Sequence, residues 1–227
     1  MSHKIITYGN LGYIEYIKNF YANLKSLDIH SLLTIYCLDD MCYKQVKGFA
    51  VGSEIIRWGA QNDTPISLLK YGKAGYETLM HEKLKIVHRE LSLGNDILYS
   101  DSDVFLFSNP LTHLTKCKKD CSFMLDWNGD ACAGFFYAKS SSLSKMIFSP
   151  SPLAGLKDFD QTLINNRLQQ KDVDYNMLDA SLFCNGPIWR GALCQWGGER
   201  IAVHYNAIDA CRKIDDMKKY GHWIIEH

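Results

Sequence analysis

The sequence predicts an α/β fold in which a mixed, mainly parallel sheet is flanked by helices, and three observations lead to this prediction. Short β-rich apolar runs alternate with segments of helical periodicity through the first half of the chain. The 227 residues, 47% of them hydrophobic, suit a single globular domain (residues 1–227) with a sizeable core. Polar residues directly follow several apolar runs, at the strand ends where open α/β sheets bind ligands.

The first half of the chain begins with a β-rich run at residues 5–8 that ends at a Gly-Asn pair. Apolar residues then recur at helical spacing over residues 12–27, which predicts an amphipathic helix. The continuous apolar run at residues 32–38 has the length of a strand and stops at Asp39. A polar, glycine-containing region covers residues 58–75.

The middle of the chain continues the alternation. Apolar residues at helical spacing predict a helix over residues 80–91, and Gly94 ends it as a C-terminal cap. The apolar runs 97–99 and 104–107 predict strands on either side of two aspartates. The same periodicities predict the later elements, which are strands at residues 121–125, 134–138, 175–178 and 201–205 and helices over 160–168 and 209–219.

Charge and composition exclude several classes of function. Lys plus Arg equals Asp plus Glu at 25 each, so this neutral chain has no field that would collect nucleic acid or an anionic membrane. No apolar run approaches the ~20 residues of a membrane span, and the first residues lack the apolar stretch of a secretory signal. The eight cysteines follow no CxxC spacing. Buried thiols in a reducing compartment explain them better than disulfides or zinc, so we expect a cytoplasmic protein.

The segment 97–107 is the most informative in the chain, because Asp101 and Asp103 interrupt an otherwise apolar β run. In extended chain, residues i and i+2 point to the same side, so both carboxylates would aim at one point. Adjacent carboxylates repel unless a cation compensates them, and magnesium or manganese typically binds carboxylates together with substrate phosphates. Asn10 and Asp39 also follow apolar strands and are expected to face the same crevice. The alternative is a polar turn whose aspartates are simply solvated.

The pattern of apolar residues around Asp-Ser-Asp, followed by Ser-Asn-Pro-Leu at 108–111, resembles the DxD glycosyltransferases of the GT-A (Rossmann-like) fold. It is most similar to the nucleotide-diphospho-sugar transferases and their retaining galactosyltransferase-like relatives. It also resembles, more narrowly, the glycosyltransferase domains that large algal viruses encode for capsid glycans; for a viral protein the compartment would be the host-cell cytoplasm. The resemblance covers most of the chain through Tyr8-Gly9-Asn10, Lys83, Cys132-Ala133-Gly134-Phe135-Phe136, Asp160-Gln161, His204-Tyr205-Asn206 and Lys213.

The resemblance implies a metal site for Mn²⁺ or Mg²⁺. In it Asp103 is a direct ligand, Asp101 reaches the metal or the donor ribose, and His204 is the third protein ligand. Neutral imidazole is a reasonable ligand for manganese. Considered without the family, His204 is more simply a core histidine on a strand.

The resemblance also implies contacts to a UDP-sugar donor, from Tyr8, Gly9, Asn10, Asp39, Lys83, Asp101 and Lys213. Tyr8 and Asn10 would hold the base and ribose, with Asp39 or its neighbour Asp40 nearby. Lys213 would meet the diphosphate and offset the charge of the leaving group. The alternatives are ordinary strand-end residues and solvated helix lysines.

Three residues are expected to be catalytic: the resemblance implies Asp160 and Gln161, and we add Asp126. Asp160 would hold donor-sugar hydroxyls, although an aspartate that opens a helix also suits an N-terminal cap. Gln161 would lie beside the reacting carbon, and because glutamine is a poor nucleophile, a front-side displacement with retention is expected.

Asp126 belongs to a polar cluster between two strands, with Trp127, Asn128 and Asp130, which we assign to sugar hydroxyl contacts. Trp127 would offer a stacking surface. Cys132 departs from the family pattern, in which a polar residue often precedes Ala-Gly, so one donor hydroxyl contact is in doubt.

The expected activity is metal-dependent transfer of a hexose or deoxyhexose from a UDP-sugar to a glycan, a glycoprotein or another hydroxyl acceptor. Two alternatives stay open. A metal-dependent nucleotidyltransferase or phosphohydrolase would use the same aspartates for attack at phosphorus and release pyrophosphate or phosphate. A sugar-binding module with a structural metal would turn over no donor.

Overall fold

The computed structural model describes residues 2–59, 67–68, 76–150, 160–170, 173–186 and 199–225. Its strands are β1 (His3–Gly9), β2 (Leu33–Cys37), β3 (Glu54–Arg57), β4 (Asp96–Ser100), β5 (Val104–Leu106), β6 (Cys121–Leu125), β7 (Ala131–Ala138), β8 (Tyr175–Met177), β9 (Phe183–Asn185) and β10 (Ala202–His204). Its helices are α1 (Ile14–Ser26), α2 (Asp40–Phe49), α3 (Tyr76–Ser92), α4 (Leu111–Leu114), α5 (Ser142–Ile147), α6 (Asp160–Gln170) and α8 (Ala210–Lys219). Two single 3₁₀ turns, η1 (Leu11–Tyr13) and η2 (His30–Leu32), precede α1 and β2.

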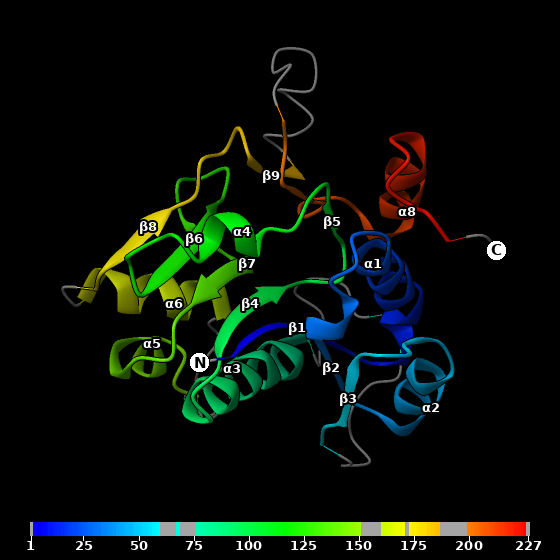
Figure 1. The fold of residues 1–227 in the computed structure, drawn as a ribbon, viewed down its shortest axis with the longest axis horizontal. Helices are drawn as coiled ribbons and strands as arrows, with labels where there is room; N and C mark the ends of the chain where they lie inside the picture. The colour runs from blue at the N-terminus through cyan, green and yellow to red at the C-terminus, as the bar shows by residue number, and fades with distance from the viewer. Residues whose placement is uncertain are drawn as a thin grey trace.

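The strands form a large sheet in the order β3-β2-β1-β4-β7-β6-β8 and a small one in the order β5-β10-β9 (Figure 1). Strands β3, β2, β1 and β4 are mutually parallel. Strand β7 is antiparallel to both β4 and β6, so β6 runs in the same direction as β4. The carboxyl ends of β1, β2, β4 and β6 therefore lie along one edge of the sheet. This arrangement confirms the predicted mixed, mainly parallel α/β fold.

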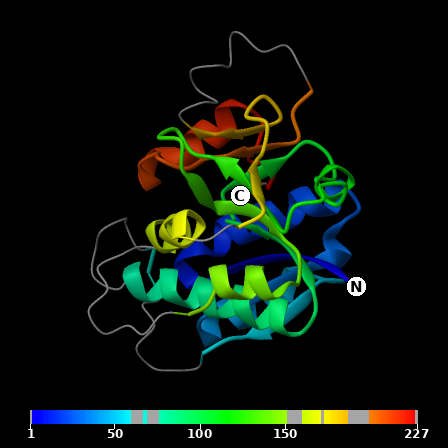
Figure 2. The ribbon, with the colours of Figure 1, turned by 90° about the vertical axis from the view of Figure 1, so that its left-hand side faces the viewer.

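Helices cover both faces of the large sheet, which explains why its central strands are apolar without alternation. Neighbouring residues of β1 show the division: Ile5 packs in the cluster with α1 and α2, and Ile6 packs in the cluster with α3, α5 and α6. The turned view shows α3 and α5 at the opposite end of the molecule from α8 (Figure 2). Each face thus buries its own core.

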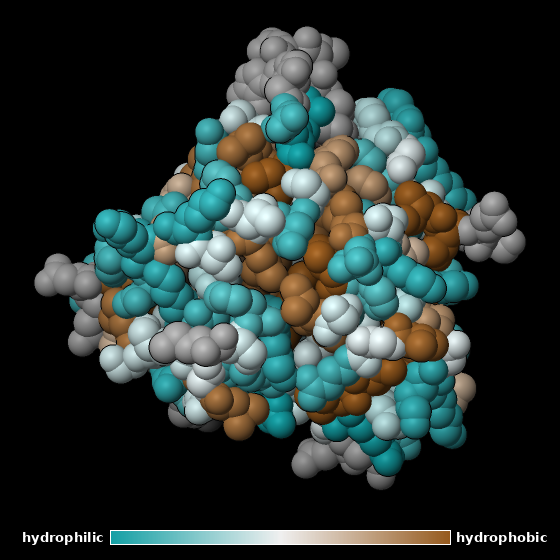
Figure 3. All heavy atoms as spheres, viewed as in Figure 1, coloured by the Kyte–Doolittle hydropathy of each residue, from teal (hydrophilic) through white to brown (hydrophobic). Residues whose placement is uncertain are grey.

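A third apolar cluster lies beside α1, where α8 and the C-terminal segment meet the small sheet. Asn19 of α1 holds this segment, because its amide donates to the carbonyl of His222 at 2.9 Å and its oxygen accepts from the N–H of Ile224 at 2.8 Å. No helix in the described part of the chain is long and apolar enough to cross a membrane. Hydrophilic side chains occupy most of the face in Figure 3, with hydrophobic groups between them.

Several elements differ from the sequence prediction. Helix α2, strand β3 and the short elements α4, α5 and β9 were not predicted. Helix α2 is only ten residues long and buries only Cys42 and Val46, and Asp39 caps it by accepting from the N–H of Cys42 at 2.8 Å. The strand predicted at 134–138 begins three residues earlier, at Ala131. Most of the polar region 58–75 lies outside the described residues.

Candidate active site

A cleft of about 890 Å³ opens at the carboxyl edge of the large sheet. The residues that line it come from segments far apart in the sequence, which are the end of β1, η1, α1, α3, the turns after β4, β6 and β10, the start of β7, the start of α6, and α8. Most of the sequence-predicted site residues lie here; Asp39 and Asn10 are the exceptions discussed below. The cleft lies where open α/β sheets bind ligands.

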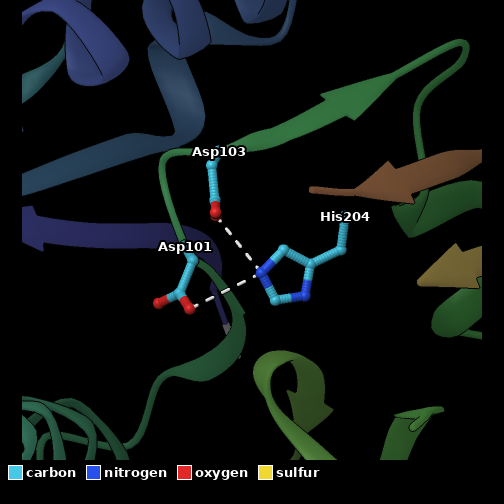
Figure 4. Close-up of side chains that lie close together, drawn as sticks. All are labelled: Asp101, Asp103 and His204. Carbon is cyan, nitrogen blue, oxygen red and sulfur yellow. Dashed lines mark ion pairs between the residues drawn. The ribbon is translucent and has the colours of Figure 1, made fainter. Parts of the chain in front are cut away.

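Three of the lining residues converge on one point (Figure 4). Asp101 and Asp103 come from the turn between β4 and β5, and His204 is the last residue of β10. Nε2 of His204 lies 3.2 Å from Oδ1 of Asp103 and 3.7 Å from Oδ2 of Asp101. One ligand atom from each of the three lies within 4.8 Å of the others.

The geometry that brings the two aspartates together is a turn and not the extended chain that the i, i+2 argument assumed. The N–H of Val104 bonds to the carbonyl of Asp101 at 3.3 Å, which reverses the chain between the carboxylates. Neighbouring strands hold this turn, because the N–H of Asp101 bonds to the carbonyl of Gly134 and the N–H of Tyr205 to the carbonyl of Asp103. The small sheet therefore places His204 opposite both aspartates.

Gly134 of β7 makes this approach of the three side chains sterically feasible. A Cβ atom on Gly134 would lie 2.2 Å from Cε1 of His204 and 2.7 Å from Oδ2 of Asp101. Two carboxylates and an imidazole are a donor set that Mn²⁺ and Mg²⁺ accept. Because Gly134 has no side chain, the ring of His204 has room to face the two carboxylates. The residues present thus fit the divalent cation that the family resemblance implies.

Lys213 of α8 brings a cation to the same carboxylate. Its Nζ donates to Oδ2 of Asp103 at 2.5 Å, whereas the other oxygen of Asp103 faces His204. Burial by itself would raise the pKa of Asp103, but the charges of Lys213 and His204 outweigh it and hold the pKa well below its ordinary value. Asp103 is therefore ionised and shared between two partners.

The far nitrogen of His204, Nδ1, lies 3.5 Å from the thiol of Cys132, so Nε2 is the nitrogen that faces the aspartates. Burial favours the neutral imidazole, but the carboxylate of Asp103 outweighs it and raises the pKa of His204 well above its ordinary value. Cys132, which stands where the family often has a polar residue, thus contacts the histidine.

Lys83 of α3 is buried beneath the cleft between two carboxylates. Its Nζ lies 2.6 Å from Asp160 and 3.4 Å from Asp101, and it also donates to the carbonyl of Ala133 at 3.2 Å. Burial opposes its charge, but the two aspartates raise the pKa of Lys83 well above its ordinary value. Asp160 is therefore tied to α3 by an ion pair in addition to its place in the first turn of α6.

Gln161 is held at both ends of its carboxamide. Its Oε1 accepts from the N–H of Ala133 at 3.2 Å, and its Nε2 donates to Oδ2 of Asp126 at 2.9 Å. The other oxygen of the Asp126 carboxylate accepts from the amides of Asn185 at 3.0 Å and Asn206 at 3.2 Å. Asp126 thus joins β6, β9, β10 and α6 at the cleft.

Tyr8 and Gly9 line the cleft, whereas Asn10 and Asp39 do not. Both carboxylate oxygens of Asp39 accept hydrogen bonds from backbone N–H groups, one from Cys42 at 2.8 Å and one from Leu11 at 2.7 Å. The oxygen of Asn10 accepts from the N–H of Gly12 at 3.0 Å. Both side chains shape the strand ends beside the cleft, and their role in holding base and ribose stays a prediction.

Sequence reasoning missed Asn185, Tyr13 and Tyr16. Asn185 is buried at the end of β9 and bonds to Asp126, and the two tyrosines line the cleft from η1 and α1. A polar residue after the apolar pair Phe-Cys was the only local signal for Asn185.

Known proteins share sequence similarity with most of this chain. A family model described as nucleotide-diphospho-sugar transferase matches residues 28–217. UDP-galactose:fucoside alpha-3-galactosyltransferase of Dictyostelium discoideum is 22% identical over an alignment of 278 positions, which covers 98% of this chain and 43% of that protein. The chain therefore spans less than half the length of this relative.

Solved structures share the fold at low sequence identity. The glycosyltransferase GlyE of Streptococcus pneumoniae TIGR4 superposes with a TM-score of 0.60 at 15% identity, over all of this chain and 61% of that one. A glycosyltransferase involved in glycosylation of the major capsid of PBCV-1 superposes with a TM-score of 0.59 at 10% identity, over 96% of this chain and 100% of that one.

Proposed function

The chain belongs to the nucleotide-diphospho-sugar transferase family, and from this premise we propose that it transfers a sugar from UDP to a glycan hydroxyl in a metal-dependent reaction. The observation that carries the proposal is the convergence of Asp101, Asp103 and His204 within 4.8 Å at the edge of the cleft. The name of the Dictyostelium relative gives UDP-galactose as that protein's donor. We therefore take a UDP-hexose as the donor and UDP-galactose as the first to test.

Asp101, Asp103 and His204 would hold Mn²⁺ or Mg²⁺. A bound divalent cation neutralises the charge of a diphosphate leaving group. Lys213 would support the same task, because its ammonium group lies 2.5 Å from Asp103 and would add positive charge beside the diphosphate. Positive charge is thus concentrated where negative charge develops.

Asp160 and Gln161 are proposed to act on the sugar. The ion pair with Lys83 fixes the buried carboxylate of Asp160, which lines the cleft and would accept from sugar hydroxyls. Gln161 orients the reacting centre but does not attack it, since an amide is a poor nucleophile and this one is held by Ala133 and Asp126. This arrangement favours a front-side displacement in which the anomeric configuration is retained.

We place the enzyme in the cytoplasm, in keeping with the six free thiols among the described residues. Its acceptor is proposed to be a glycan or glycoprotein.

The test is to incubate the purified protein with UDP-galactose, Mg²⁺ and a panel of glycoside acceptors. The proposal expects release of UDP and a product whose first-formed anomer has the configuration of the donor, as read by proton NMR. Release of phosphate or pyrophosphate would instead indicate attack at phosphorus, and donor binding without turnover would indicate a sugar-binding module. An inverted product would refute retention and require a general base.

A further inference from the structure

The turn between β6 and β7, residues 126–130, forms one end of the cleft. Because β6 runs parallel to β4, this turn lies at the same sheet edge as the Asp101 and Asp103 carboxylates. In the strand order β1-β4-β7-β6 it lies two strands beyond the metal ligands and three beyond Tyr8, or about 10 and 14 Å along the sheet. The turn is therefore on the far side of the metal ligands from the proposed nucleotide site.

The turn is tightly built. The N–H of Asp126 bonds to the carbonyl of Asp130 at 2.8 Å, and the N–H of Gly129 to the carbonyl of Asp126 at 3.0 Å. Gly129 has a φ of 90°, which favours glycine. The amide of Asn128 donates to Oδ2 of Asp130 at 2.6 Å, and the N–H of Trp127 donates to Oδ1 of Asp126 at 2.9 Å.

This rigid turn holds the side chain of Trp127 out of the core. The residue is 68% exposed and lines the cleft together with Asn128 and Asp130. An indole exposed beside amide and carboxylate groups at the end of a cleft has the character of a binding surface.

The turn is also linked to the reacting centre. Asp126, whose backbone closes the turn, accepts from the amide of Gln161 at 2.9 Å. Gln161 and Trp127 therefore line the same cleft and are joined through Asp126.

We propose that Trp127 is the platform for the acceptor sugar, and that the acceptor presents a neutral pyranoside. The C–H face of a pyranose ring stacks on the indole, and the ring hydroxyls bond to Asn128 and Asp130. A neutral sugar fits this end better than an anionic group, because the carboxylate of Asp130 would repel an anion. The inference rests on the proposed transferase function and adds the acceptor's class and its site.

Saturation-transfer NMR tests the proposal with the full chain, Mg²⁺ and UDP. The probes are the methyl α- and β-pyranosides of galactose, glucose, fucose, rhamnose and xylose. For the wild type, the proposal expects saturation of ring protons on one face of at least one glycoside. Trp127→Ala should weaken the binding of that glycoside at least tenfold, and Trp127→Phe should retain part of it, while the UDP signal is unchanged in both.

Leu93→Ala is the matched control, since Leu93 is also an exposed apolar residue (60%) but does not line the cleft. It should leave both signals unchanged. Glycoside binding that is undiminished in Trp127→Ala, or the absence of any glycoside signal from a wild type that binds UDP, would overturn the platform alone. A wild type that binds no UDP would overturn the proposed function and the platform with it.

Discussion

At the scale of single residues, our proposal depends on the contact between Gln161 and Asp126. The amide of Gln161 donates to Asp126, and Asp126 in turn accepts from two asparagines and a backbone N–H. The carboxylate is thus surrounded by donors and makes a poor general base in this position. Its role in our account is to fix the orientation of the amide.

Asp126→Asn should therefore lower kcat by about ten- to a hundredfold while the Kd for UDP stays within twofold, because a misplaced positioning group costs rate more than nucleotide binding. The double variant Asp126→Asn/Gln161→Glu restores a donor–acceptor pair between the two side chains and should recover part of the loss. Steady-state kinetics and UDP titration on the same preparations provide the measurement. A parallel loss of UDP binding would show that Asp126 supports the whole site and not the amide alone.

Gly134 offers a second test at this scale. A Cβ atom there would lie 2.2 Å from the His204 ring, so Gly134→Ala should displace the histidine and abolish the rise in Tm that Mg²⁺ and UDP produce. Gly48→Ala is the control, because Gly48 is exposed on α2 and a Cβ atom added there would meet nothing within 4 Å. This change should stabilise the protein by about 0.5–1 kcal/mol. An unaltered ligand-induced rise in Gly134→Ala would refute the assigned crowding.

The sequence allowed the two aspartates to be predicted as a pair, because they interrupt an apolar run. The side chains that complete the site were visible only through the family resemblance. His204 comes from a strand of the small sheet, and its position opposite Asp101 and Asp103 depends on long-range pairing of β10 with β5. Local periodicity does not determine such pairings.

At the scale of elements, α8 and the segment after it connect the site to the rest of the molecule. Lys213 extends from α8 to Asp103. His222, in the segment after α8, stacks on Phe105, and its Nδ1 lies 2.6 Å from the hydroxyl of Tyr205. Burial and the nearby charge of Arg200 lower the pKa of His222 to about 4. The folded segment therefore requires the neutral imidazole.

A dependence of stability on pH follows, with the sign set by the lowered pKa. Well above pH 6.5 the imidazole is neutral in both the folded and the unfolded chain and contributes no pH dependence. Between pH 6.5 and about 4 the unfolded chain binds a proton that the folded chain does not, so the free energy of unfolding decreases as the pH falls, by up to ~3 kcal/mol. His222→Gln should be less stable at pH 7.5 but lose less stability on acidification, as measured by urea unfolding at several pH values. Equal acid sensitivity in both proteins would rule out this role.

The elements that sequence reasoning missed share a physical cause. Helix α2 buries only two residues, and the four-residue edge strand β3 has no fully buried residue, so neither contributes a long apolar run to the sequence. Their structure depends on caps and on strand pairing, such as the bond that the N–H of Cys42 donates to the carboxylate of Asp39. Strands β2 and β4 are buried at every residue and α1 at seven residues, so these elements gave clear apolar patterns in the sequence.

At the scale of the whole molecule, alternating periodicity was enough to predict the fold class, and the resemblance to nucleotide-diphospho-sugar transferases is confirmed by the family match. The order of strands was not predictable, because the antiparallel insertion of β7 and the separate small sheet are decided by contacts between distant segments. That order is what gives the cleft its two ends, one beside β1 and one beside β6. The donor and acceptor sites that we propose occupy these ends.

The most direct test of the central claim is a calorimetric titration of UDP into the purified protein with Mg²⁺ or Mn²⁺ and again with a chelator. Our account predicts saturable binding with the metal and at least a hundredfold weaker binding in chelator. Asp103→Asn should abolish the metal-dependent binding, because it removes the charge that faces both His204 and Lys213. Equal affinity for UDP with and without the metal would contradict the claim that Asp101, Asp103 and His204 hold a cation for the diphosphate.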